Sequence, residues 1–124
     1  MRKVGVHPNS LLKNNGDGTF SDVSYSSKII SRHPTQVASW ADYNNDGWLD
    51  VFIGNESEPD DIHPSELFKN NGDGTFTNVA SELGVAKFKG AIKGADWGDI
   101  NNDGWPDLYA VSYTHLTLPT TPYV

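Results

Sequence analysis

WADYNNDGWLD, at residues 40–50, returns as WGDINNDGWPD at residues 97–107. A second block, KNNGDGTF at residues 13–20, recurs letter for letter at residues 69–76. Both blocks repeat with a period of about 56 residues. A period near or slightly above the range of about 20–50 residues is typical of solenoids and propellers. The chain is therefore expected to consist of repeated structural units.

Each unit shows the pattern of short β-strands. Apolar runs at 37–40 and 91–95 precede the first motif, and runs at 51–53 and 108–110 follow it. Asn-Gly and Asp-Gly between apolar runs are strong hairpin signals, because both residue types accept positive φ. About four strands per period is the count of one propeller blade. We predict an all-β fold, a fragment of a β-propeller with about two four-stranded blades.

Composition excludes several function classes. The 124 residues include 16 acidic and 9 basic ones, which gives a net charge of −7. Because the chain is acidic and has no basic patch, it is a poor candidate for binding nucleic acid. No apolar run approaches the roughly 18 residues of a membrane span, so no membrane insertion is expected. The absence of cysteine excludes disulfides, thiolate zinc sites and cysteine nucleophiles.

The first motif places oxygen-bearing side chains at positions 1, 3, 5 and 9 of a loop. Ca²⁺ prefers about six to eight oxygen ligands, a glycine at position 6 permits the sharp turn, and the carbonyl of position 7 then faces the ion. Three carboxylates around an empty loop repel one another, and a divalent cation relieves this repulsion. We therefore predict one Ca²⁺ per loop. The expected ligands are Asp42, Asn44, Asp46, the Trp48 carbonyl and Asp50, then Asp99, Asn101, Asp103, the Trp105 carbonyl and Asp107.

Other loops share this pattern. An EF-hand requires Glu at position 12, where this chain has Ile53 and Ala110, so an EF-hand is disfavoured. A dockerin-like calcium-dependent interaction module is an alternative, although dockerin loops are followed by helices. A further alternative is a turn rich in Asp, Asn and Gly that binds no ion.

The two motifs together resemble the FG-GAP/VCBS repeat family, which includes the propellers of integrin α-subunits. The resemblance covers residues 7–110 and implies calcium in the loop between the first two strands of a blade. It also implies an extracellular, periplasmic or cell-surface location, and binding of a protein or glycan partner or adhesion rather than catalysis. The alternative is the propeller portion of a secreted polysaccharide-active enzyme.

The repeat boundaries predict the organisation of the chain. Residues 1–34 are expected to form the outer strands of a first blade, 35–90 one complete blade, and 91–110 the inner strands of the next. Two blades cannot close a ring, so the remaining blades of a parent chain are expected neighbours. Residues 111–124 resemble a translated sequencing adapter and are expected to be a non-native tail, the alternative being a genuine strand. The first six residues lack the apolar run of a signal peptide.

The remaining candidates are expected to be structural. Asp17 and Asp73 are interpreted as hairpin residues rather than metal ligands. A short helical turn is possible at 81–83, ended by Gly84. His63, which has acidic neighbours at Asp60, Asp61 and Glu66, is expected to lie in a solvated loop rather than in a metal or acid–base site. A set of aromatic residues is expected to fill the core between blades: Phe20, Trp40, Phe52, Phe76, Trp97 and Tyr109.

Overall fold

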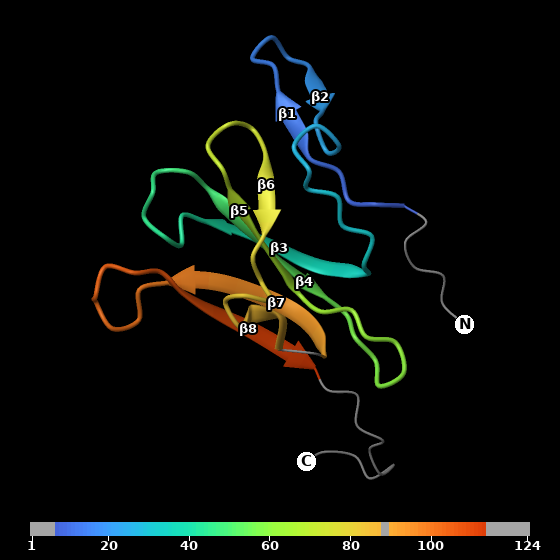
Figure 1. Cartoon of the computed structure of the whole chain (residues 1–124), viewed down its shortest axis with the longest axis vertical. Coiled ribbons are helices and arrows are strands. Elements are labelled where there is room, and N and C mark those ends of the chain that lie inside the picture. Colours follow the sequence, from blue (N-terminus) through green and yellow to red (C-terminus); the bar gives the residue numbers. More distant parts are fainter. Residues whose placement is uncertain (1–6, 88–89, 114–124) are drawn as a thin grey trace.

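The computed structural model describes residues 7–87 and 90–113, and these form three antiparallel sheets (Figure 1). The first sheet pairs β1 (Leu12–Asn14) with β2 (Phe20–Asp22). The central sheet has the order β3 (Thr35–Ala41), β4 (Asp50–Asn55), β5 (Glu66–Asn70) and β6 (Phe76–Asn78). The third sheet pairs β7 (Ala91–Gly98) with β8 (Asp107–Tyr113). The described part contains one short 3-10 helix, η1 (Val85–Lys87), so the predicted all-β fold is confirmed.

Strand β4 lies between β3 and β5 in the central sheet and is buried along its whole length, so both of its faces are covered. Side chains of a strand alternate between its two faces. Val51 and Ile53 therefore enter one apolar cluster, with Ile29, Phe68 and Phe76. Phe52 enters the other, with Leu67, Val79, Ala80 and Ile92. Burying each such large side chain contributes about 1.5–3 kcal/mol. The second cluster holds β7 against the central sheet, and the first attaches Leu11 and Ile29, which flank the first sheet.

The repeated KNNGDGTF block forms the β1–β2 and β5–β6 hairpins with the same hydrogen bonds in both copies. In the second copy, Gly72 N donates to Asn70 Oδ1 over 2.9 Å, and Thr75 N donates to Asp73 Oδ1 over 2.9 Å. The Thr75 hydroxyl donates to the same carboxylate over 2.6 Å. In the first copy, Asp17 accepts the equivalent bonds. The prediction that these two aspartates serve the hairpins is confirmed.

The expected aromatic core is only partly correct. Phe52 and Phe76 are buried and Trp97 packs against the second cluster, but Phe20, Trp40 and Tyr109 are 61%, 44% and 74% exposed. Phe20 and Tyr109 lie on the two-stranded sheets, whose outer faces no other described sheet covers. The prediction that these three residues are core residues is therefore wrong for this chain.

Two further points concern local structure. The possible turn at 81–83 is present, because Leu83 N donates to the Val79 carbonyl over 3.1 Å and Gly84 follows with φ 81°, and η1 comes directly after it. Strand β8 runs to Tyr113, three residues past the expected end of the repeat, and pairs there with Ala91. Residues 114–124 of the expected tail lie outside the described residues. In the part of the chain that the structure describes, no helix is long and apolar enough to cross a membrane.

Candidate metal centre

The first acidic loop connects β3 to β4 and is curled around its own carboxylates. Asp42 accepts hydrogen bonds from Asp46 N over 3.1 Å and from Gly47 N over 2.7 Å. Asp46 in turn accepts one from Trp48 N over 2.9 Å. Asn45 and Gly47 have φ values of 58° and 88°, a region that asparagine and glycine adopt most readily. The sequence thus contains the residues that this tight turn requires.

The second acidic loop, between β7 and β8, has the same geometry. Asp99 accepts hydrogen bonds from Asp103 N over 3.1 Å and from Gly104 N over 2.7 Å. Asp103 accepts one from Trp105 N over 3.0 Å. Both loops are followed by strands rather than helices, so the dockerin-like and EF-hand alternatives do not fit.

In each loop, three of the expected ligands come together. One carboxylate oxygen from each of Asp42, Asp46 and Asp50 lies within 4.8 Å of the others, and the same holds for Asp99, Asp103 and Asp107. These are hard oxygen donors of the kind that Ca²⁺ prefers. The donor set of each loop therefore fits a divalent cation.

The two asparagines predicted as ligands differ in their surroundings. Asn44 Oδ1 is buried and has no hydrogen-bond partner within the described residues, whereas Asn101 is exposed. A buried acceptor without a partner costs about 1–3 kcal/mol, which a cation at this position would offset. The orphaned oxygen of Asn44 thus independently fits a cation in the first loop.

Asp50 joins the first loop to the rest of the central sheet. Its side chain is fully buried, accepting hydrogen bonds from Tyr43 N over 3.2 Å and from Asn70 N over 2.7 Å. Burial raises the pKa of Asp50, and the nearby charges of Asp46 and Asp42 raise it further, against the lowering effect of the two backbone donors. A positive ion beside these carboxylates would favour the ionised form of Asp50.

The other carboxylates of the loops are better solvated. The N–H of Trp48 lowers the pKa of Asp46, and the N–H of Gly104 lowers the pKa of Asp99. Asp107 accepts a hydrogen bond from Ile100 N over 2.9 Å, the counterpart of the bond from Tyr43. The loops are therefore held in a curled form by their own hydrogen bonds.

Trp48 and Trp105, whose carbonyls are the remaining expected ligands, are half exposed. The Trp48 indole lies over the β5–β6 hairpin, because a Cβ atom on Gly72 would be 3.0 Å from its Nε1 atom. The first loop therefore contacts β5 through Asp50 and the following turn through Trp48.

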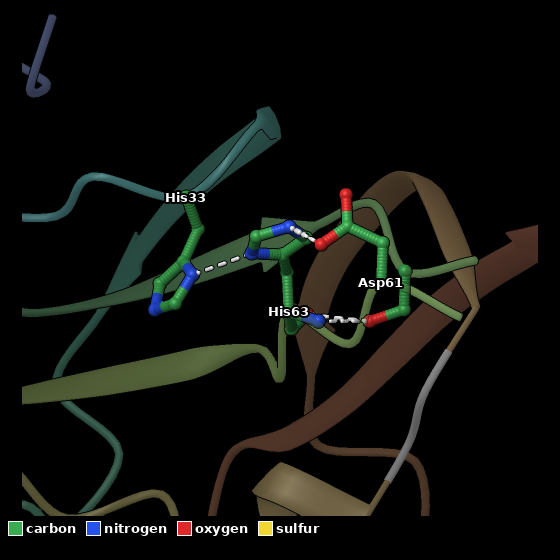
Figure 2. Close-up of polar contacts among 4 residues, drawn as sticks. His33, Asp61 and His63 are labelled. Carbon is green, nitrogen blue, oxygen red and sulfur yellow. Dashed lines mark hydrogen bonds and ion pairs between the residues drawn. The ribbon is translucent and has the colours of Figure 1, made fainter. Parts of the chain in front are cut away.

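A second polar cluster surrounds His63, and here the expected solvated loop is wrong (Figure 2). The His63 residue is only 7% exposed. Its Nδ1 atom lies 2.9 Å from Nδ1 of His33, and its Nε2 atom lies 2.8 Å from Oδ1 of Asp61. Ser57 Oγ donates to the His63 carbonyl over 2.8 Å and accepts from His63 N over 2.6 Å. These contacts close the β4–β5 connection and tie it to the segment before β3.

The imidazole rings of this cluster do not form a three-ligand metal site. Asp61 and His33 contact opposite nitrogens of the His63 ring, so the three side chains do not converge on one point. His33 was missed in the sequence because it lies outside the repeated blocks. Only its contact with His63 identifies it.

Comparison with known proteins places these observations in a family. The family of FG-GAP-like repeats matches residues 4–53 and 42–110, which include both acidic loops. Cartilage acidic protein 1 of Xenopus tropicalis is 38% identical over 78 residues, covering 60% of this chain and 11% of the relative. The Homo sapiens protein of that name is 33% identical over 75 residues, with the same two shares. The chain thus spans 11% of the length of these curated relatives. It belongs to the FG-GAP-like repeat family, whose propeller-type scaffolds serve binding.

Proposed function

We propose that each acidic loop binds one Ca²⁺ ion and that the chain is a calcium-stabilised part of a propeller scaffold. The observation that carries this proposal is the convergence of three carboxylate oxygens within 4.8 Å, which occurs in both loops. The orphaned Asn44 oxygen adds support in the first loop. The proposed ligands are the ten residues named from the sequence, with backbone carbonyls from Trp48 and Trp105.

The proposed role of the ion is structural. Two Ca²⁺ ions add four positive charges and would change the formal net charge from −7 to −3. Asp50 is bonded to β5 and also lies in the first loop, so an ion held there would tie that loop to β5. The bound cation would supply charge neutralisation, while the loop's own N–H groups keep the carboxylates in place.

We further propose that the central sheet is a complete blade within residues 35–90. The sheets of residues 1–34 and 91–110 would then be the outer and inner strands of its neighbours. The four-stranded order β3-β4-β5-β6 and the apolar cluster on each face support this division. Residues 111–113 continue β8, which favours the inclusion of these three positions in that strand.

The proposed setting is extracellular, periplasmic or on the cell surface, and the proposed activity is binding of a protein or glycan or adhesion, not catalysis. Extracellular calcium modules bind with dissociation constants of about 10⁻⁴–10⁻³ M, and such sites fill only where calcium is abundant. The carboxylates of the loops are all committed to loop geometry, which favours a scaffold over an enzyme.

Calorimetric titration with Ca²⁺, together with thermal melting, tests the calcium proposal. The full chain should bind two ions and melt at a higher temperature. Asp46→Ala and Asp103→Ala should each remove one site, while Asp60→Ala, at an exposed acidic residue outside both loops, should retain two. Neither heat nor a rise in melting temperature with Ca²⁺ would refute the proposal. Hydrolysis of a glycan by the chain would refute the non-catalytic part.

A further inference from the structure

The two acidic loops touch each other. The side-chain amide of Asn45, in the first loop, donates a hydrogen bond to the Gly104 carbonyl in the second loop over 2.8 Å. The two residues are 59 positions apart in the chain, and Figure 1 shows their loops at the same edge of the molecule. This contact crosses from the central sheet to the β7–β8 sheet.

Both ends of this bond lie beside the expected cation ligands. Asn45 stands between the ligand positions of Asn44 and Asp46, with its backbone in the left-handed region at φ 58°. Gly104, at φ 88°, immediately precedes Trp105, whose carbonyl is an expected ligand of the second loop. An ion that orders one loop therefore fixes one partner of the bond, which restrains the ligand-bearing turn of the other loop.

We infer that the two loops bind Ca²⁺ with positive cooperativity, coupled through the Asn45–Gly104 bond. This inference rests on the proposed calcium sites. The ordering of the second loop is partly complete once the first is occupied, so the second ion meets a smaller entropic cost. Coupling of this kind is reciprocal, so either ion strengthens binding of the other by the same factor.

The expected coupling between the two sites is small, and the electrostatic repulsion between the two ions, which opposes it, must be screened. A single exposed hydrogen bond supports a coupling of about two- to fivefold in affinity. For two equal sites this corresponds to a Hill coefficient of about 1.2–1.4. Repulsion between the two dications acts in the opposite direction, but at 0.15 M salt it is screened over about 8 Å. The titration therefore belongs at this ionic strength or above.

The interface offers a matched pair of variants. Asn45→Gly removes the donor and keeps a residue that tolerates positive φ. Asn102→Gly makes the same change at the equivalent position of the second loop, where φ is 60° and no side-chain hydrogen bond to the first loop is seen in the described residues. Any general effect of glycine on loop order is shared by both variants, whereas the bond is lost in only one.

Amide NMR of the full chain during Ca²⁺ titration tests the inference, because the Gly47 and Gly104 amides each report on their own loop. In the unmodified chain and in Asn102→Gly, each signal should follow a sigmoidal curve. In Asn45→Gly they should follow hyperbolic curves with midpoints about 1.4- to 2.2-fold higher, the square root of the coupling factor. Hyperbolic curves in the unmodified chain, or cooperativity that survives Asn45→Gly, would overturn the inference.

Two controls separate the possible failures. If neither amide shifts with Ca²⁺, the proposed calcium sites fail, whereas two ions binding independently reject only the coupling. Asp103→Ala empties the second loop and leaves Asn45 intact. It should raise the Ca²⁺ midpoint of the first loop by the same factor, about 1.4- to 2.2-fold, and an unchanged midpoint there would also overturn the inference. This second measurement decides the question if Asn45→Gly does not fold.

Discussion

Gly54, on β4, is the most closely packed of the glycines in the described part of the chain. A Cβ atom there would lie 2.6 Å from Cγ2 of Ile92 on β7 and 2.6 Å from Cγ1 of Val37 on β3. Ordinary van der Waals contact begins at 3.4 Å, so both contacts would be too short by almost 1 Å. The Gly54 backbone does not have the positive φ that favours glycine. The obstacle to a larger residue is therefore packing alone.

We expect Gly54→Ala to lower the free energy of unfolding by about 1–3 kcal/mol, the usual cost of overpacking a core by one methyl group. Alanine regains up to about 1 kcal/mol by restricting the unfolded chain, and this gain is included in the range. The matched control is Gly94→Ala on β7, where a Cβ atom would meet nothing within 4 Å. This control should be neutral or stabilising by up to about 1 kcal/mol.

Urea denaturation of the two variants, with and without Ca²⁺, measures this difference. Gly54→Ala should shift the midpoint to lower urea at an unchanged slope, and Val37→Ala should cost less in the Gly54→Ala background than alone, because it removes one of the clashing atoms. If the two glycine variants are equally stable, the sheets are not packed as closely as described. The reasoning would then be refuted.

Two other predictions concern turns and charges. Gly72→Ala should destabilise the chain more than Gly16→Ala. Both glycines have left-handed φ values, but only Gly72 lies under the Trp48 indole. Equal losses of unfolding free energy in the same urea assay would contradict this. In calcium-free buffer, NMR titration should place the pKa of Asp73 below the ordinary value of 3.8, because Thr75 hydrogen-bonds its ionised form, and that of Asp50 above 3.8, because burial disfavours charge. The Asp73 contribution to stability is then present above pH 3.8 and lost as the pH falls further. Ionisation of Asp50, in contrast, lowers the stability of the calcium-free chain as the pH rises above 3.8. A titration midpoint of Asp73 above that of Asp50 would contradict these pKa directions.

The features that the sequence predicted well are those determined by neighbouring residues. The KNNGDGTF turns close through bonds between residues two positions apart, and the acidic loops through bonds four or five positions apart. Identical letters therefore give identical geometry in each copy. The number of strands in the central sheet also followed from the sequence, because each short apolar run of the repeat forms one strand.

The features that the sequence did not predict depend on contacts between distant residues. His63 is buried because His33, 30 positions earlier, packs against its ring. Phe20 and Phe76 occupy the same place in the repeat, yet Phe20 is 61% exposed and Phe76 only 8%. Phe76 packs against the ring of Trp40 and enters the first apolar cluster, whereas Phe20 lies on a two-stranded sheet. The pattern of one repeat specifies its own strands, and burial depends on which sheet lies beside it.

The acidic loops show how these local and distant contacts combine. Asp50 and Asp107 hold the same place in the motif, but Asp50 is buried and bonded to the following strand β5, while Asp107 is half-buried and its described bond stays within its own loop. A buried carboxylate raises the cost of an empty site, because its charge is poorly solvated and lies near two others. Packing of β5 against the first loop would therefore increase the free energy that a cation contributes there, and ion binding and assembly of the central sheet would be parts of one equilibrium.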